Sequence, residues 1–254
     1  MWPTIRMPGT DVTTSSYHLL HVVAWFAFYF AGSNLTRSRP DLVRHWFWLA
    51  VGFGLCDTVG ARYAFRLIHG RHESGFFGTP VLFAAWTGAY VLVRRVRAYP
   101  FLDAWAIAFS AAHVFEKLSC LAAGCCFGRS TTAWYGLAVH AAEGDPRRWV
   151  TLPPLEAGLH LASALGLGWL YARGYAKGRL VMVLGLGYGL WRSAVEMARA
   201  GQSSAFLDGP LTLTQVACVL AMAFSLTYLL ISKEAHSADR PTGGPRLGDL
   251  GAPR

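Results

Sequence analysis

Charged residues are scarce in this chain of 254 residues. Only 15% of the residues are Asp, Glu, Lys or Arg, whereas 54% are hydrophobic and the mean hydropathy is +0.33. An ordinary soluble domain carries about 25% charged residues. The shortage of charge therefore excludes an ordinary soluble domain and predicts an integral membrane protein.

Cysteine is also rare, and its spacing matches no familiar framework. Five cysteines in a helical chain without a secretory leader do not indicate a disulfide scaffold. Three of them lie close together, at Cys120, Cys125 and Cys126, but this spacing fits no zinc pattern and no second cysteine pair follows. A metal or redox site remains the alternative, and we expect small packing residues there, with no metal and no cofactor.

Several other signals are missing. No alternating strand pattern and no internal repeat stands out, and residues 1–16 contain too few hydrophobic residues for the apolar core of a cleavable signal peptide. Inverted repeats and interrupted helices are typical of transporters. Their absence from the sequence ranks a small transporter last among the functions considered.

The sequence does contain seven apolar segments of roughly membrane-spanning length, about 17–25 residues each. Trp and Tyr lie near their ends, as is typical of membrane interfaces, at Trp46, Trp48, Tyr99, Trp134, Tyr135, Trp149, Tyr171 and Tyr228. We predict an all-α polytopic membrane protein with about seven transmembrane helices around a central lipid-binding cavity. The predicted segments are 17–35, 46–68, 78–93, 101–123, 154–172, 180–199 and 210–231.

The basic residues predict the orientation. If successive loops alternate sides, the side of the C-terminus holds Arg37, Arg39, Arg44, Arg94, Arg95, Arg97, Arg173, Lys177, Arg179, Lys233, Arg240, Arg246 and Arg254. The other side holds only Arg6, Arg71, Arg129, Arg147, Arg148 and Arg199. This imbalance predicts a cytoplasmic C-terminus and an external N-terminus. It also accounts for the net charge of +9, so a nucleic-acid partner is rejected.

These assignments predict one domain with two appendages. Residues 1–232 form the seven-helix membrane domain, and its loop 127–152 lies outside the membrane as a lid or a connector. Residues 233–254 are rich in Pro, Gly and charge, which predicts a disordered cytoplasmic tail.

A few charged residues lie inside the apolar segments or at their rims. Burying a charge there is costly, so such residues are candidates for a functional site. They are Asp57, Arg62, Arg66, Glu116, Lys117, Glu156, Arg192 and Glu196. Arg192 and Glu196 are four residues apart, so they share a helix face and can pair. The alternative is that this pair is purely structural.

The stretch from His113 to Arg129 carries the densest chemistry. His113, Glu116, Lys117 and Cys120 are separated by three or four residues, which places them on one side of a helix. His and Glu are the usual proton carriers. This cluster is therefore either an acid–base site or a buried, mutually satisfied polar network.

Four groups of residues resemble the bacterial prolipoprotein diacylglyceryl transferase family over residues 17–231. The central stretch keeps a glycine framework at Gly124, Gly128 and Arg129. The second segment carries Gly60, Ala61 and Arg62, and the sixth carries Tyr188, Gly189, Arg192, Glu196 and Arg199. Tyr17, Glu156 and Ala157 match further family positions.

The resemblance implies transfer of a diacylglyceryl group from phosphatidylglycerol to the lipobox cysteine thiol of a prolipoprotein signal peptide. It implies a monomer in the bacterial inner membrane, with no cofactor. The catalytic candidates are His113, Glu116, Lys117, Arg192 and Glu196. The candidates for binding the lipid phosphate are Arg62, Lys117, Gly128, Arg129, Arg192 and Arg199, and Tyr17, Cys120, Glu156 and Tyr188 line the remainder of the cavity.

The chain also departs from the family pattern. Lys117 replaces a family Arg, Glu116 a Gly and Cys120 an Asn, and the family Ser-Phe-His-Gly-Gly motif reads Gly-Phe-Phe-Gly-Thr, with Phe77 in place of the histidine. Phenylalanine cannot accept a proton, so another base acts or the reaction is lost. The available bases are His113, Glu116, His69 and His72. The alternative function is a non-catalytic lipid-binding or assembly protein of the same family.

Overall fold

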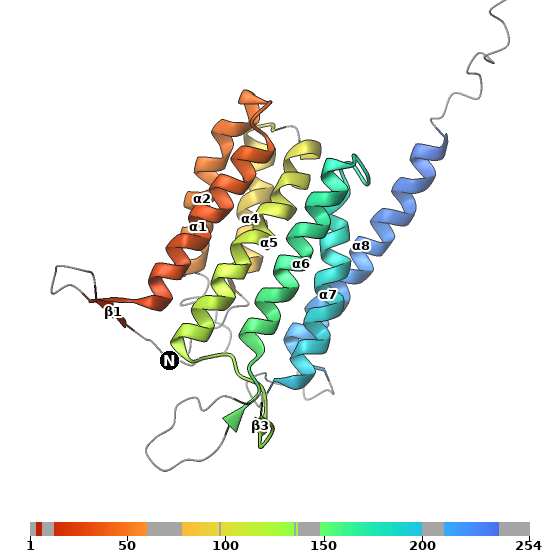
Figure 1. The fold of residues 1–254 in the computed structure, drawn as a ribbon. Coiled ribbons are helices and arrows are strands. Elements are labelled where there is room, and N and C mark those ends of the chain that lie inside the picture. The colour runs from red at the N-terminus through yellow and green to blue at the C-terminus, as the bar shows by residue number, and fades with distance from the viewer. Residues whose placement is uncertain are drawn as a thin grey trace, which may run out of the picture.

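The computed structural model describes residues 4–6, 13–59, 78–96, 98–134, 136, 148–199 and 211–238. This part of the chain forms seven α-helices and two short strand pairs (Figure 1). The helices are α1 (Ser16–Leu35), α2 (Pro40–Val59), α4 (Gly78–Val93), α5 (Ala98–Ala123), α6 (Leu152–Ala172), α7 (Leu180–Ala198) and α8 (Leu213–Ala238). The antiparallel pairs are β1 (Thr4–Arg6) with β2 (Thr13–Ser15), and β3 (Ser130–Thr131) with β4 (Arg148–Trp149).

The helices follow the predicted segments, with differences at the ends. α2 begins at Pro40 rather than at residue 46, because proline is well suited to the first helical turn and Asp41 complements the helix dipole there. Residues 60–68 of the predicted segment lie outside the described residues. α8 continues to Ala238, past the predicted domain end at residue 232, and 239–254 are also outside the described range.

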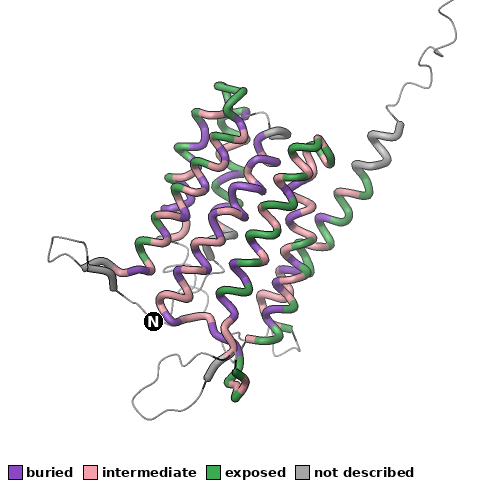
Figure 2. The backbone as a smooth tube through the Cα atoms, viewed as in Figure 1, coloured by how far each residue is buried: buried purple, intermediate pink, exposed green. Residues whose placement is uncertain are grey.

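α5 lies at the centre of the bundle, between α1 and α6 (Figure 1). The segment Phe101–Ala123 of α5 is long and apolar enough to cross a membrane, and so is Leu213–Ile231 of α8. Half of the first segment is buried, whereas α8 packs mainly on α7 and is largely exposed (Figure 2). The exposed side chains of α8 include Leu220, Phe224 and Ile231. An apolar surface of this kind is expected to face lipid.

Aromatic side chains form the core between α1, α2, α4 and α5. Phe28, Trp46, Phe53 and Phe83 are fully buried, and the ring of Phe28 lies 5.4 Å from each of the other three. Trp46 packs directly on Gly32 of α1, where any side chain would collide with the indole. This core reaches as far as His113 of α5, whose ring lies 6.2 Å from that of Phe53, and it packs the four helices together.

One buried acid has a structural role. Asp103 of α5 is 3% exposed and accepts hydrogen bonds from the backbone N–H groups of Gly178 and Leu180, at 2.5 and 3.0 Å. These amides lie at the start of α7, so the carboxylate caps that helix from a neighbouring one. Asp103 therefore fixes α7 relative to α5.

Candidate functional site

Glu156 joins two cations from different helices. This carboxylate, near the start of α6, is fully buried. Its Oε2 contacts Nζ of Lys117 on α5, and its Oε1 accepts a hydrogen bond of 2.8 Å from Nη2 of Arg199, just after α7. The two predicted site residues Lys117 and Arg199 are thus brought together by a third, Glu156.

The contacts continue to the end of α7. Arg199 Nε lies 3.6 Å from Oε2 of Glu196, and the same oxygen lies 2.8 Å from Nη1 of Arg192. The predicted pairing of Arg192 with Glu196 is confirmed. We call the continuous chain Lys117, Glu156, Arg199, Glu196 and Arg192 the charge network.

The charge network carries one positive charge in excess, because three cations alternate with two carboxylates. Lys117, Glu156, Arg192 and Glu196 are each at most 5% exposed. Buried charges are costly unless they are paired, and a net charge in such a place invites a ligand of opposite sign. The network is therefore suited to hold one singly charged anion.

His113 and Glu116 form a proton-sharing pair beside the network. Both are at most 2% exposed. Nδ1 of His113 donates a hydrogen bond of 2.9 Å to the carbonyl oxygen of Phe109, which leaves Nε2 as the basic nitrogen of a neutral ring. Nε2 lies 3.1 Å from Oε2 of Glu116, close enough for a proton to pass between the two groups. The predicted acid–base pair is geometrically competent to accept or release a proton.

His160 belongs to the same site and was not among the predicted residues. It lies on α6, is 1% exposed, and its ring centroid is 4.9 Å from that of His113. Neither of its ring nitrogens has a hydrogen-bond partner among the described residues. Tyr188 and Trp191 of α7 lie beside it, with ring centroids at 5.8 and 5.0 Å. A histidine one turn after Glu156 was the available sequence signal, because such spacing places both on one helix face.

Tyr17 approaches the site from α1. Its ring lies 4.2 Å from that of His21, whose Nε2 is 3.6 Å from Oδ2 of Asp57 on α2. The Tyr17 hydroxyl is within electrostatic range of Glu116 and Cys120. Residues from α1, α2, α5, α6 and α7 therefore meet at one end of the bundle.

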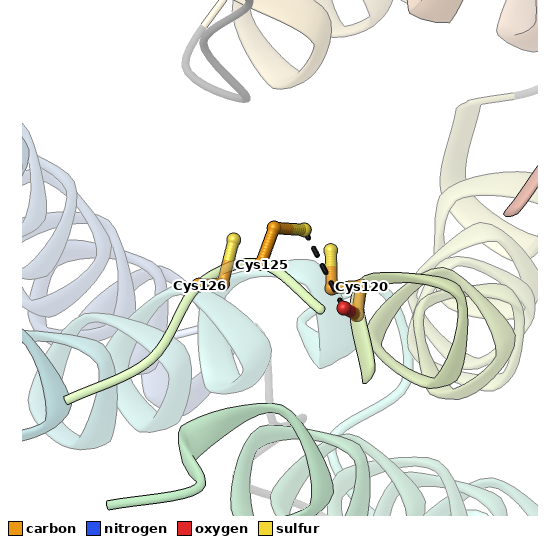
Figure 3. A group of neighbouring side chains, drawn as sticks. All are labelled: Cys120, Cys125 and Cys126. Carbon is orange, nitrogen blue, oxygen red and sulfur yellow. Dashed lines mark hydrogen bonds between the residues drawn. The ribbon is translucent and has the colours of Figure 1, made fainter. Parts of the chain in front are cut away.

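Cys120, Cys125 and Cys126 converge at the end of α5, where their Sγ atoms lie within 4.8 Å of one another (Figure 3). Sγ of Cys125 also donates to the carbonyl oxygen of Cys120, at 3.5 Å. Hydrogen bonds from the other two thiols lower the pKa of the Cys126 thiol, and nearby Lys117 and Arg199 lower it further, against the opposing effect of burial. The convergence is compatible with both sequence hypotheses, small packing residues and a metal or redox site.

The predicted phosphate-binding residues Gly128 and Arg129 have backbone roles. The N–H of Gly128 donates to the carbonyl oxygen of Val150 at 2.8 Å, and that of Arg129 donates to the carbonyl oxygen of Ala198 at 3.2 Å. The Gly128 N–H is thus already hydrogen-bonded within the protein. Arg129 is exposed. Their contacts fasten the end of α5 to the start of α6 and the end of α7.

Replacing Gly128 with alanine should destabilise the protein. The added Cβ would lie 2.8 Å from the carbonyl oxygen of Ala198 and 3.0 Å from Cβ of Val150. Overpacking of this kind costs about 1–3 kcal/mol. Gly166→Ala is the matched control, because nothing lies within 4 Å of its added Cβ and alanine favours a helix by up to about 1 kcal/mol. Thermal unfolding in detergent should give midpoints shifted in opposite directions, and equal midpoints would contradict the close approach.

Some predicted residues lie outside the described part of the chain. They are Arg62, Arg66, His69, His72 and Phe77, together with the loop residues Tyr135, His140 and Arg147. Trp134 of the same loop is 88% exposed.

A groove of about 580 Å³ lies at the opposite end of α1, where Tyr29, Ser33 and Arg37 contribute to its lining. It is separate from the charge network, whose side chains pack against one another.

The described residues combine two helices that are long and apolar enough to cross a membrane with a buried charge network at one end of the bundle, which indicates a helical membrane protein. A comparison with family models identifies the group of proteins concerned. The model for prolipoprotein diacylglyceryl transferase matches residues 9–231, and the chain belongs to this family of membrane-bound transferases. Among the curated proteins, none matches the chain. The family match confirms the resemblance found in the sequence.

Proposed function

We propose that this protein transfers a diacylglyceryl group from phosphatidylglycerol to the lipobox cysteine thiol of a prolipoprotein. The observation that carries the proposal is the single excess positive charge of the buried charge network. A phosphodiester carries one negative charge at neutral pH, so phosphatidylglycerol would neutralise the network. The family match supports the same chemistry at a coarser level.

The arginines of the network suit this role better than lysine would. A guanidinium presents several N–H donors in a planar fork that matches phosphate oxygens. Glu196 holds Arg192 with one contact of 2.8 Å, which leaves further donors for a ligand. During transfer the phosphate gains a second negative charge as glycerol phosphate leaves, and fixed cations stabilise such a charge most strongly in a buried site.

The proton and electron balance requires a base. The lipobox thiol loses its proton, its sulfur forms a C–S bond to the diacylglyceryl carbon, and the C–O bond to the phosphate breaks. A free thiol has a pKa of about 8.5, so it needs help to ionise at neutral pH. His113 with Glu116 is our proposed base, since the pair already shares a proton site and Phe77 cannot serve.

The site would open toward the outer leaflet of the bacterial inner membrane. This follows from the predicted orientation, with the N-terminus outside and the C-terminus in the cytoplasm, because the network lies at the end of the bundle where α1 begins and α5 and α7 end. Both substrates would enter from the membrane, and the protein would act as a monomer without nucleic-acid partners.

A second candidate is a non-catalytic lipid-binding protein of the same family. The observation that favours it is the replacement of the family histidine by Phe77 and of the family asparagine by Cys120. Such a protein would retain the anion site and lack turnover. The two candidates differ in one measurable product, because only the transferase would release glycerol phosphate.

The deciding measurement is release of glycerol phosphate from labelled phosphatidylglycerol by the purified protein, with and without a lipobox peptide. We expect release that depends on the peptide. Arg192→Lys should reduce it about 10- to 100-fold, because the charge remains and a charge-assisted hydrogen bond of about 1.5–3 kcal/mol is lost. Arg37→Lys is the control, since Arg37 is exposed and distant.

The outcomes separate the candidates. Release without peptide would indicate a lipase or another acceptor. Absence of release from folded protein that retains phosphatidylglycerol in native mass spectrometry would favour the lipid-binding protein. Absence of both release and lipid retention would refute the proposed function.

A further inference from the structure

The three clustered cysteines are placed by an unusual turn. After α5 ends at Ala123, the chain takes positive φ values at Gly124 (73°) and at Cys126 (63°). Glycine adopts this conformation freely, but a cysteine there costs of the order of 1 kcal/mol and persists only where the surroundings require it. The turn brings the Sγ atoms of Cys125 and Cys126 back to Cys120, on the last turn of α5 (Figure 3).

The spacing of the sulfur atoms suits a metal. With Zn–S bonds of about 2.3 Å, sulfurs around one tetrahedral zinc lie roughly 3.8 Å apart. The Sγ atoms here lie within 4.8 Å of one another without any ion, so a small contraction would complete the site. None of the three is oxidised to a disulfide, and all three are partly exposed, whereas the packing cysteine Cys218 is buried.

Two cations lie near the sulfur cluster. Lys117 and Arg199 lie within electrostatic range of Cys126. Among the described residues, no fourth His, Cys, Asp or Glu joins the group. A site with three protein ligands and one open position is the arrangement that catalytic zinc sites use.

We propose that Cys120, Cys125 and Cys126 bind one zinc ion and leave its fourth position open for a thiol. Soft thiolate ligands select zinc or copper(I) over harder cations, and zinc adds no redox step. The part concerning the thiol rests on the proposed function. The acceptor cysteine would bind zinc as its thiolate, its proton passing to the His113–Glu116 pair. The bound sulfur then forms the C–S bond while glycerol phosphate departs with the C–O electron pair.

The position of the cluster fits this use. Cys120 lies three residues after Lys117, so the two share one side of α5. A thiolate held there would lie beside the charge network that we assign to the phosphate. Zinc lowers the pKa of a bound ligand strongly and deprotonates a coordinating thiol outright. The site would thus offset the loss of the family histidine at Phe77.

The test uses cobalt(II) as a coloured substitute for zinc in the full-length protein, purified in detergent with a phosphine reductant and freed of metal. We expect one cobalt per chain, a thiolate-to-cobalt absorption band, and loss of that band when zinc is added. Cys125→Ser and Cys126→Ser should each weaken binding at least about tenfold, as loss of a direct ligand exceeds the effect of a supporting residue. Cys56→Ser, outside the cluster, should bind cobalt like the unaltered protein.

Absence of the band, or equal weakening in Cys56→Ser, would overturn the metal site. A disulfide within the cluster in the fully reduced preparation, detected by mass, would overturn it too. A lipobox peptide should then change the cobalt spectrum, whereas its Cys→Ser form should not. If both peptides leave the spectrum unchanged, the open-position role is refuted. Because cobalt binding is measured without phosphatidylglycerol, its failure is distinguishable from failure of the transfer reaction.

Discussion

Replacing His113 with glutamine should lower peptide-dependent release of glycerol phosphate about 10²- to 10⁴-fold, the usual contribution of a general base. Glutamine keeps a similar polar shape and can still donate a hydrogen bond to the carbonyl oxygen of Phe109, but it cannot accept the thiol proton. The 3.1 Å contact with Glu116 would no longer share a titrating proton. The loss should appear in kcat, because the lipid phosphate is held by other residues.

Two further histidines separate this role from a structural one. His45 is also buried, and its Nδ1 forms a hydrogen bond of 2.9 Å with the Tyr90 hydroxyl, away from the site. His45→Gln should leave kcat nearly unchanged in folded protein. His160→Gln should have an intermediate effect through the ring that lies against His113. A larger loss for His160→Gln than for His113→Gln would transfer the role of base to His160.

The sequence predicted those parts of the site that lie within one helix. The contact of Arg192 with Glu196 spans four residues and that of His113 with Glu116 spans three. Helical geometry alone places such pairs on one face, so spacing was sufficient. Hydropathy likewise located the helices, because an apolar segment of membrane-spanning length can be recognised from the sequence alone.

Contacts between helices could not be predicted in this way. Glu156 meets Lys117 and Arg199 because α6 packs against both α5 and α7. His160 lies against His113 for the same reason. Residue spacing along one helix does not encode how neighbouring helices pack. The family resemblance predicted Glu156 and Arg199 as site residues but did not predict that they contact each other.

The role of a residue depended on its backbone as well as its side chain. Gly128 matches the family pattern and is a predicted phosphate-binding residue, but its N–H donates to the carbonyl oxygen of Val150. A side chain there would also collide with the carbonyl oxygen of Ala198. The cysteines converge only because Cys126 adopts a positive φ. Gly124 was the one sequence signal for that turn, since glycine commonly ends a helix in this conformation.

Replacing Glu156 with glutamine should lower the free energy of unfolding by about 3–5 kcal/mol, the usual cost of removing one partner from a buried ion pair. Lys117 and Arg199 would lose their shared carboxylate, and the network would hold three positive charges against one negative charge. Glutamine has nearly the same volume, so the loss would not arise from a cavity. Chemical denaturation in detergent micelles measures the change. Asp41→Asn, in the first turn of α2, is the control.

The double variant Lys117→Met with Glu156→Gln distinguishes coupling from general damage. If the two side chains interact directly, the double variant should lose less stability than the sum of the single variants. Additive losses would contradict the network. An anionic lipid provides a second test of the network. A phosphate bound there would replace part of the negative charge that Glu156→Gln removes. Phosphatidylglycerol should therefore stabilise Glu156→Gln more than the unaltered protein, and a zwitterionic lipid should not. Equal stabilisation of both proteins would place the lipid away from the charge network.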